Sequence, residues 1–153
     1  MTEQERMEQY LDKTMEENNV DQKDIICGLM KSIKGGCSYE NKSITLGFPV
    51  QEWQANRAGL MHGGMICTAF DMTAAALARF FAKEFYVPTI SLDVKYIRPV
   101  QIGDTLDVTV TATAAGKRIT QIQAEAISRN TGKLAATAAS VYMNVDIVKE
   151  RQG

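Results

Sequence analysis

Two stretches of the chain carry apolar residues at helical spacing. Residues 3–18 form an otherwise charged segment with one apolar stripe, made by Met7, Tyr10, Leu11 and Met15. Such a stripe predicts an amphipathic helix that lies against another surface. In residues 62–83 apolar side chains occupy nearly every face of the helix, with six alanines between Ala69 and Ala82. We expect this second helix to be surrounded by other elements.

Most of the remaining chain alternates apolar and polar residues, as half-buried strands do. From Gly35 to Pro49 the alternation predicts a hairpin. Four further strands are predicted after the long helix, with their apolar faces formed by Ile90, Leu92, Val94 and Tyr96; Leu106, Val108, Val110 and Ala112; Ile122, Ala124 and Ala126; and Val141, Met143 and Val145. The short turns between them favour an antiparallel meander.

These elements predict an α+β fold in which a curled antiparallel sheet of five or six strands wraps around a long central helix. The chain of 153 residues suits one domain with one core. Because no second long apolar helix is present to cover the central one, the sheet must do so. We expect residues 31–150 to form this domain and residues 1–30 to form an accessory helical segment.

Composition excludes several classes of protein. With 45% hydrophobic and 23% charged residues, the chain resembles a folded globular protein and not a disordered one. Three cysteines without C-x-x-C spacing and a single histidine argue against a disulfide framework and against a Cys/His zinc site. The acidic N-terminus lacks the apolar core of a signal peptide, and the longest apolar stretch contains Asp71 and Arg79. We therefore expect a cytoplasmic protein without a membrane partner.

The charge is distributed unevenly along the chain. Residues 1–24 contain eight acidic and three basic residues, which leaves ten acidic and fourteen basic residues for the rest. A surplus of four scattered bases is too small for a nucleic-acid surface but suits a small polyanionic ligand. The candidate phosphate-binding residues at strand ends and turns are Arg98, Lys117, Arg118, Arg129 and Lys133, although each of them can equally be a solvated turn residue.

Three segments resemble a known family. They are NRAGLMHGGMICTAFD from Asn56 to Asp71, TISLDVKYIRPV beginning at Thr89, and the Gly103–Asp104 pair. Together they resemble the hotdog-fold acyl-CoA thioesterases of the phenylacetate (PaaI-like) type over about residues 35–147. The resemblance implies hydrolysis of an acyl- or aryl-CoA thioester to free acid and CoA. It implies no metal and no cofactor, since coenzyme A is part of the substrate.

The resemblance also assigns roles to single residues. It makes Asp71 the catalytic carboxylate, gives the N–H of Gly64 the task of polarising the thioester carbonyl, and places Asn56 in the active site. His62 corresponds to a positioning residue. Ser91, beside Thr89 on the predicted strand, matches a hydroxyl that helps to hold the attacking water.

The residues support parts of this chemistry without the family. Gly63 and Gly64 lie where a loop becomes a helix, so N–H groups without helical partners and the positive end of the helix dipole can stabilise an oxyanion. A plain strand-to-helix turn explains the glycines equally well. An ionised Asp71 in an apolar helix is costly without partners, which favours a general base or nucleophile over a structural acid. His62 is a second base candidate or a turn cap.

Helix geometry adds a prediction about assembly. Gly64 and Asp71 are seven residues apart, hence about 10 Å along the helix axis, too far to act on one reacting group. If both act, Gly64 of one subunit meets Asp71 of another across a two-fold axis. We expect a homodimer with two interface sites, and a dimer of dimers beyond it.

Two other functions remain open. A non-catalytic acyl-CoA binding or sensing module would keep the glycines and basic turns but would not need Asp71. An acyl-thioester dehydratase would need an acid/base histidine paired with a carboxylate, and the only histidine here lies at the helix start. A purely structural domain is the remaining alternative, and Asp71 argues against it. The sequence leaves the identity of the acyl group undetermined.

Overall fold

A computed structural model describes residues 1–83 and 86–146. The helical elements are α1 (Glu3–Glu16), the π-helical turn η1 (Glu17–Asp21), α2 (Ile26–Leu29), the short η2 (Glu52–Gln54) and α3 (Gly63–Ala82). The strands are β1 (Ile33–Ser38), β2 (Ser43–Pro49), β3 (Thr89–Tyr96), β4 (Thr105–Ala115), β5 (Ile119–Ser128) and β6 (Leu134–Met143). The predicted domain end at residue 150 lies outside the described residues.

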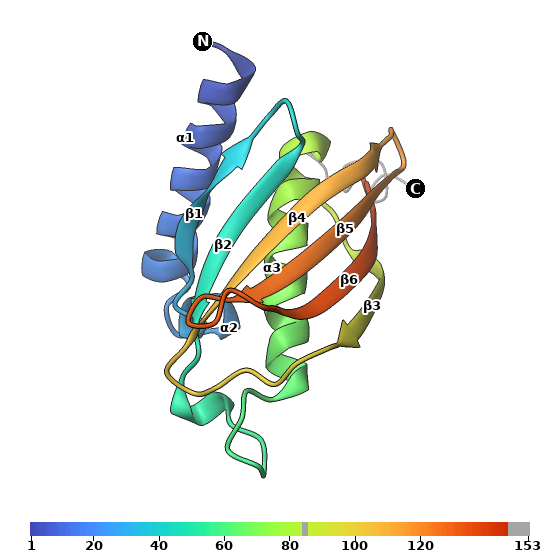
Figure 1. Ribbon diagram of the computed structural model, residues 1–153. Coiled ribbons are helices and arrows are strands. Elements are labelled where there is room, and N and C mark those ends of the chain that lie inside the picture. The colour runs from blue at the N-terminus through green and yellow to red at the C-terminus, as the bar shows by residue number, and fades with distance from the viewer. Residues whose placement is uncertain (84–85, 147–153) are drawn as a thin grey trace.

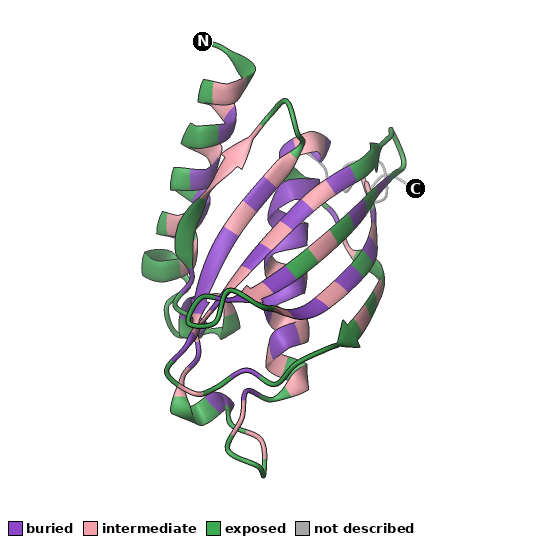
Figure 2. Ribbon diagram, in the orientation of Figure 1, coloured by how far each residue is buried: buried purple, intermediate pink, exposed green. Residues whose placement is uncertain are grey.

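The six strands form one curled antiparallel sheet in the order β1-β2-β4-β5-β6-β3, and α3 lies against one face of it (Figure 1). The predicted α+β architecture is therefore confirmed. On β4 the apolar side chains of Leu106, Val108 and Val110 have no exposed surface, while alternate threonines point to the other face (Figure 2). Burying each such side chain contributes about 1.5–3 kcal/mol.

The predicted meander is wrong for its first strand. β3 pairs with β6 at one edge of the sheet, and β4 pairs with β2 in the middle. The segment after β3 carries the chain from the edge to the centre, so consecutive strands are not neighbours there (Figure 1). Only β4, β5 and β6 form the meander. β3 consequently has one side without a strand partner among the described residues.

The predicted inner face of the last strand is also wrong. Val141 and Met143 lie on the outer face, and Val145 lies beyond β6 in an isolated bridge with Tyr86. The buried positions facing α3 are instead Ala136, Ala138, Ser140 and Tyr142. Three of these four side chains are small, which allows the helix to approach the sheet, and hydrophobicity alone gives no signal for that arrangement.

The N-terminal helix packs against β1 at the opposite edge of the sheet (Figure 1). Thr2 and Glu5 form a capping box at its start. Met7 and Leu11 are fully buried, and the Tyr10 hydroxyl donates a 2.6 Å hydrogen bond to the carbonyl oxygen of Ala76 in α3. The predicted helix is confirmed, although its last turn widens into η1. The boundary at residue 30 stays a prediction.

The central helix is enclosed on only part of its circumference. Phe70 and Leu77 are fully buried against the sheet, whereas Asp71 and Met72 are half-buried and Arg79 is exposed. The expectation of a surrounded helix is therefore wrong within one chain, because the sheet covers one side. By length and composition alone this helix can cross a membrane, but 56% of its most apolar window is buried, as in a core helix.

Candidate active site

His62 shapes the start of α3. It is the N-cap residue, and its Nδ1 accepts a 2.8 Å hydrogen bond from the backbone N–H of Gly64. A neutral imidazole whose Nδ1 accepts in this way carries its proton on Nε2. In this geometry His62 has no free ring nitrogen with which to accept a proton from water. The structure therefore favours the capping interpretation of His62 over the general-base one.

A hollow of about 440 Å³ lies on the outer face of the sheet, but a second hollow of about 530 Å³ adjoins the start of α3. Five of the predicted site residues line this second hollow: Asn56, His62, Gly63, Gly64 and Arg98. They come from the loop before α3, the first turn of the helix and the segment after β3. The fold thus brings together residues that lie more than 40 positions apart in the sequence.

Hydrogen bonds hold the wall of this hollow in place. The Asn56 Oδ1 accepts from the backbone N–H groups of Ala58 at 2.8 Å and Leu60 at 3.1 Å, which leaves its Nδ2 as the group that can donate to a ligand. Arg98 donates to the carbonyl oxygen of Leu134 at 2.8 Å. Both side chains are thereby oriented before any ligand binds.

Tyr96 closes over the first turn of the helix. Its hydroxyl donates a 2.9 Å hydrogen bond to the carbonyl oxygen of Gly63 and lies 3.0 Å from the sulfur of Cys67. A Cβ at Gly63 would lie 3.1 Å from the Tyr96 ring, so a larger residue here would have to shift Tyr96 by a few tenths of an ångström. The two glycines stand out in the sequence, whereas nothing in the sequence marks Tyr96 as the residue that contacts them.

Asp71 is held by two hydroxyl groups. Its Oδ1 accepts hydrogen bonds of 2.8 Å from Thr89 Oγ1 and of 2.8 Å from the Tyr142 hydroxyl. Burial, followed by the nearby Asp71 carboxylate, raises the pKa of Tyr142 above its ordinary value, so this hydroxyl stays a protonated donor. Within residues 1–83 and 86–146 the second oxygen of Asp71, Oδ2, has no hydrogen-bond donor, so it is available to a ligand or water.

Two hollows border Asp71. One of about 240 Å³ lies toward β3, between Cys67, Thr68, Thr89 and Leu92. The other, of about 340 Å³, lies toward the N-terminal segment and is lined by Asn18, Ile26, Cys27, Thr68, Met72, Ala75 and Arg79. Neither contains Gly64, and the hollow at the helix start does not contain Asp71. Within one chain the two principal candidates therefore line separate cavities.

Thr89, and not Ser91, supplies the hydroxyl at Asp71. A register irregularity between Thr89 and Ser91 changes the pairing with β6, so Thr89 lies opposite Tyr142 and Ser91 opposite Val141. Ser91 is exposed on the outer side of the sheet. The structure consequently brings together Asp71, Thr89 and Tyr142, and it leaves Ser91 apart from them. Tyr142 was not among the predicted site residues, because the face of this strand formed by Val141 and Met143 was expected to point inward.

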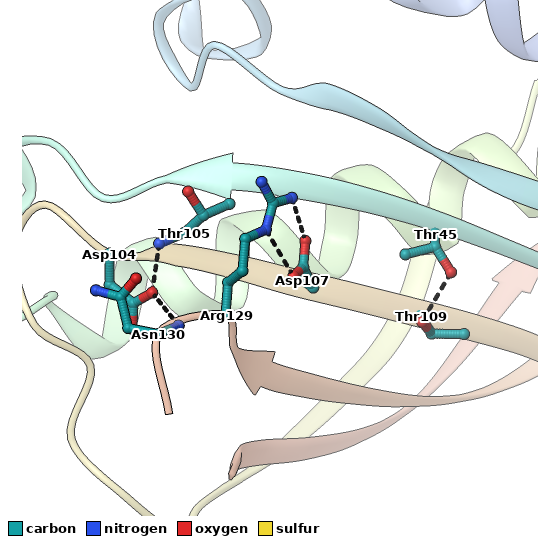
Figure 3. Close-up of polar contacts among 7 residues, drawn as sticks. All are labelled: Thr45, Asp104, Thr105, Asp107, Thr109, Arg129 and Asn130. Carbon is teal, nitrogen blue, oxygen red and sulfur yellow. Dashed lines mark hydrogen bonds and ion pairs between the residues drawn. The ribbon is translucent and has the colours of Figure 1, made fainter. Parts of the chain in front are cut away.

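The five candidate phosphate-binding residues lie in different parts of the structure. Arg98 lies beside Gly64 in the hollow at the helix start, as a CoA-binding residue would. Arg129 instead makes two hydrogen bonds with the carboxylate of Asp107, at 2.8 and 3.0 Å, near the Thr45–Thr109 pair (Figure 3). Its guanidinium is therefore already occupied. The other three are exposed: Lys117 borders a hollow beyond the far end of α3, and Arg118 and Lys133 lie in turns.

The Gly103–Asp104 pair organises a turn. The buried Asp104 carboxylate accepts hydrogen bonds from the Thr105 N–H at 2.6 Å, the Asn130 N–H at 3.1 Å and the Ser128 hydroxyl at 2.5 Å (Figure 3 shows the first two). Gly103 has a positive φ of 90°, which favours glycine. This part of the family-like pattern thus joins β4 to the β5–β6 turn. It does not reach Asp71 or Gly64.

No group of three histidine, cysteine, aspartate or glutamate side chains within residues 1–83 and 86–146 is arranged to hold a metal ion.

Comparison with known families identifies the chain. Residues 58–135, just over half of its length, match the model of the thioesterase superfamily. The chain belongs to this superfamily. The matched region includes Gly64, Asp71 and Thr89. It excludes the N-terminal segment, Asn56 and Tyr142, so those parts of the site are not described by the superfamily pattern.

Two curated relatives match part of the chain. Acyl-coenzyme A thioesterase 13 of Mus musculus is 28% identical over 89 residues, which cover 57% of this chain and 62% of the relative. A Caenorhabditis elegans protein described as an esterase is 29% identical over 87 residues, 57% of this chain and 52% of that protein. The matched part thus spans roughly half to three fifths of these relatives.

Solved thioesterase-superfamily structures share the fold. Mouse thioesterase superfamily member 2 aligns with a TM-score of 0.75 and 20% identity over 94% of this chain and 98% of that chain. The PaaI protein of the Escherichia coli phenylacetic acid degradation operon aligns with a TM-score of 0.73 and 16% identity, over 89% of this chain and 96% of that chain. A Streptococcus mutans protein bound to acetyl CoA aligns with a TM-score of 0.64 and 19% identity, over 71% of this chain and 86% of that chain. The expected hotdog fold is confirmed.

Proposed function

We propose that this protein hydrolyses acyl-CoA thioesters to the free acid and CoA. The observation that carries this proposal is Asp71, a carboxylate on the open face of α3 that two hydroxyls hold between two hollows. Membership of the thioesterase superfamily and the similarity to a mouse acyl-coenzyme A thioesterase support the reaction class. The acetyl CoA bound by the Streptococcus mutans neighbour supports the substrate class.

Asp71 is the proposed general base. Its Oδ1 is fixed by Thr89 and Tyr142, so Oδ2 can accept a proton from a water molecule as the water oxygen attacks the thioester carbon. The electron pair of the carbonyl moves to its oxygen to give a tetrahedral oxyanion. When the tetrahedral oxyanion collapses, the carbon–sulfur bond breaks, and the departing CoA thiolate takes up the proton that Asp71 accepted from water. In the alternative mechanism, the Asp71 carboxylate itself attacks the thioester carbon as a nucleophile.

The N–H of Gly64 is the proposed oxyanion donor. It lies at the start of a 20-residue helix, where the dipole favours negative charge. In the structure His62 Nδ1 occupies this N–H. A thioester carbonyl that binds here must displace the imidazole, so we propose that His62 caps the empty site.

The site is proposed to form between two subunits. Seven helical residues separate Gly64 from Asp71 by about 10 Å, and the two line different cavities of one chain. Apolar side chains are exposed on and after the edge strand β3, where Ile90, Tyr96 and Ile97 are 46–56% exposed. Antiparallel pairing of two α3 helices beside this edge would bring Gly64 of one chain to Asp71 of the other.

The CoA portion is proposed to lie in the hollow at the helix start. Arg98 offers a guanidinium there, next to the Gly64 N–H, and guanidinium groups bind phosphates through charge-assisted hydrogen bonds. Arg129 is a weaker candidate because Asp107 already engages it. Lys117 lies at the far end of α3 and would have to contact CoA from another direction.

Thiol release from acyl-CoAs tests the proposal. The assay should use acetyl-, octanoyl-, palmitoyl- and phenylacetyl-CoA, with free CoA measured by a thiol reagent. We expect release from at least one substrate, and an Asp71→Asn variant should lower kcat by at least ~10²-fold with little change in acyl-CoA binding. Asn at this position preserves the size of the side chain but cannot accept the proton.

Two results would contradict the hydrolase. Near-normal turnover by Asp71→Asn would remove the carboxylate from the reaction. Binding of acyl-CoAs by the wild-type protein without release from any substrate would instead favour a binding or sensing module.

A further inference from the structure

The cavity beside Asp71 has two walls from distant parts of the chain. One wall is the open face of α3, with Asp71, Met72 and Ala75. The other comes from the N-terminal segment, where Ile26 and Cys27 face the same 340 Å³ space. This second wall precedes residue 58, where the superfamily match begins. It is therefore a feature of this chain that the superfamily pattern does not supply.

From this arrangement we infer that the N-terminal segment forms one wall of the acyl-binding subsite and that Ile26 limits the length of the acyl group. The inference rests on the proposed hydrolase function. It extends that function by assigning the acyl and CoA ends of the substrate to different cavities.

The lining matches an aliphatic acyl chain. Ile26, Met72 and Ala75 supply apolar surface to the cavity, and Asn18 and Thr68 are also in its lining. Asp71 marks the proposed reacting end. The opposite end is marked by Arg79, eight residues further along α3 and hence about 12 Å away along the axis. Pockets for small molecules are typically apolar with a few polar groups. The dimensions suit an acyl group of medium length that lies along the helix.

The polarity of the cavities fixes the direction of the substrate. The hollow at the helix start carries Arg98 and the Gly64 N–H, which suit phosphates and a carbonyl oxygen. The cavity by Ile26 lies on the other side of Asp71 along the helix and offers no second cation near the reacting end. An acyl-CoA with its carbonyl at Gly64 of one subunit would therefore extend its acyl chain past Asp71 of the other.

The exposure of α2 agrees with a binding role. Ile26 is 42% exposed although it faces a cavity, and Leu29, one turn later, is 45% exposed without lining that cavity. An apolar ligand would cover Ile26 and leave Leu29 in water. The two residues thus form a matched pair, because they share a helix, a side-chain size and a degree of exposure.

Substitution of this pair tests the inference. Ile26→Trp should fill the cavity and lower kcat/KM for octanoyl-CoA by about 10-fold or more, while kcat/KM for acetyl-CoA changes by less than about 3-fold. Leu29→Trp should leave both values within about 2-fold of wild type. Ala75→Leu, which fills the cavity from the helix side, should reproduce the effect of Ile26→Trp. Thermal unfolding checks that each variant is folded.

The outcomes separate this inference from the proposed function. An unchanged acyl preference in both Ile26→Trp and Ala75→Leu would overturn the subsite, as would an equal shift in Leu29→Trp. If the wild-type protein releases no thiol, the hydrolase fails but the subsite can still be measured by binding. Ile26→Trp should then weaken octanoyl-CoA binding at least ~10-fold and leave CoA binding unchanged, and equal weakening of both ligands would overturn the inference.

Discussion

At the scale of single residues, the proposed reaction depends on how one carboxylate is held. Asp71 lies on a largely apolar helix, where an unpartnered charge would be costly, yet it is half-buried and accepts two hydroxyl donors. The raised pKa of Tyr142 keeps its proton in place well above neutral pH. The Tyr142 hydroxyl is therefore available as a donor to Asp71 at neutral pH.

Tyr142→Phe tests this arrangement. A hydrogen bond to a charged group contributes about 1.5–3 kcal/mol, so its loss should lower kcat by about 10- to 150-fold. KM should be nearly unchanged, because Tyr142 lines none of the hollows beside Gly64 and Asp71. Steady-state kinetics with the best acyl-CoA substrate measures both parameters.

Tyr10→Phe is the matched control for that variant. The Tyr10 hydroxyl also donates to α3, but to the carbonyl oxygen of Ala76 and not to Asp71. Its removal should lower the free energy of unfolding and leave kcat intact. Wild-type kcat in Tyr142→Phe, or an equal loss in both variants, would show that the Tyr142 hydroxyl serves only the fold.

The candidate site was predictable as far as its residues carry a local signal. Gly63, Gly64 and Asp71 stand out because glycines at a helix start and an acid in an apolar helix contradict the surrounding pattern. Tyr142 gives no such signal, since an aromatic residue on an alternating strand looks like ordinary core. The choice between Thr89 and Ser91 depends on a strand irregularity that the sequence does not show.

At the scale of elements, strong periodicity predicted the type of each helix and strand, but it predicted the inner face of only some strands and did not predict which strands are neighbours. The inner faces of β4 and β5 and the span of α3 follow the sequence pattern closely. The place of β3 beside β6 does not, because pairing between distant strands leaves no mark on local alternation. The small inward residues of β6 likewise reflect the closeness of α3, which is a tertiary property.

The contribution of α1 can be measured by its removal. Met7 and Leu11 are fully buried, so deleting residues 1–16 should remove about 3–6 kcal/mol of stabilisation and still leave a folded domain. Urea unfolding of the two chains measures the difference, with Gln9→Ala, at an exposed α1 position, as the control. An unchanged midpoint would show that α1 contributes nothing to the core. If the truncated chain is insoluble, α1 belongs to the domain, and the start of the domain lies before residue 30.

At the scale of the whole molecule, the open face of α3 and the apolar edge at β3 are adjacent to the two half-sites. A single chain presents the oxyanion donor and the carboxylate in separate cavities. The proposed two-fold dimer would bring them together at two sites, and it would also cover the surface around Ile90 and Tyr96, which are exposed in one chain. The proposed reaction therefore requires an assembly and not only a fold.

Complementation between two inactive variants tests this shared site most directly. Asp71→Asn lacks the base, and Gly64→Val should block the oxyanion N–H, because a Cβ at Gly64 would already lie 3.0 Å from His62 Nδ1. After the variants are mixed and exchange subunits, each heterodimer contains one site with both changes and one site with neither. Random pairing should restore about a quarter of wild-type activity. No recovery despite verified subunit exchange would contradict the shared site, because every site built within one chain would keep a lesion.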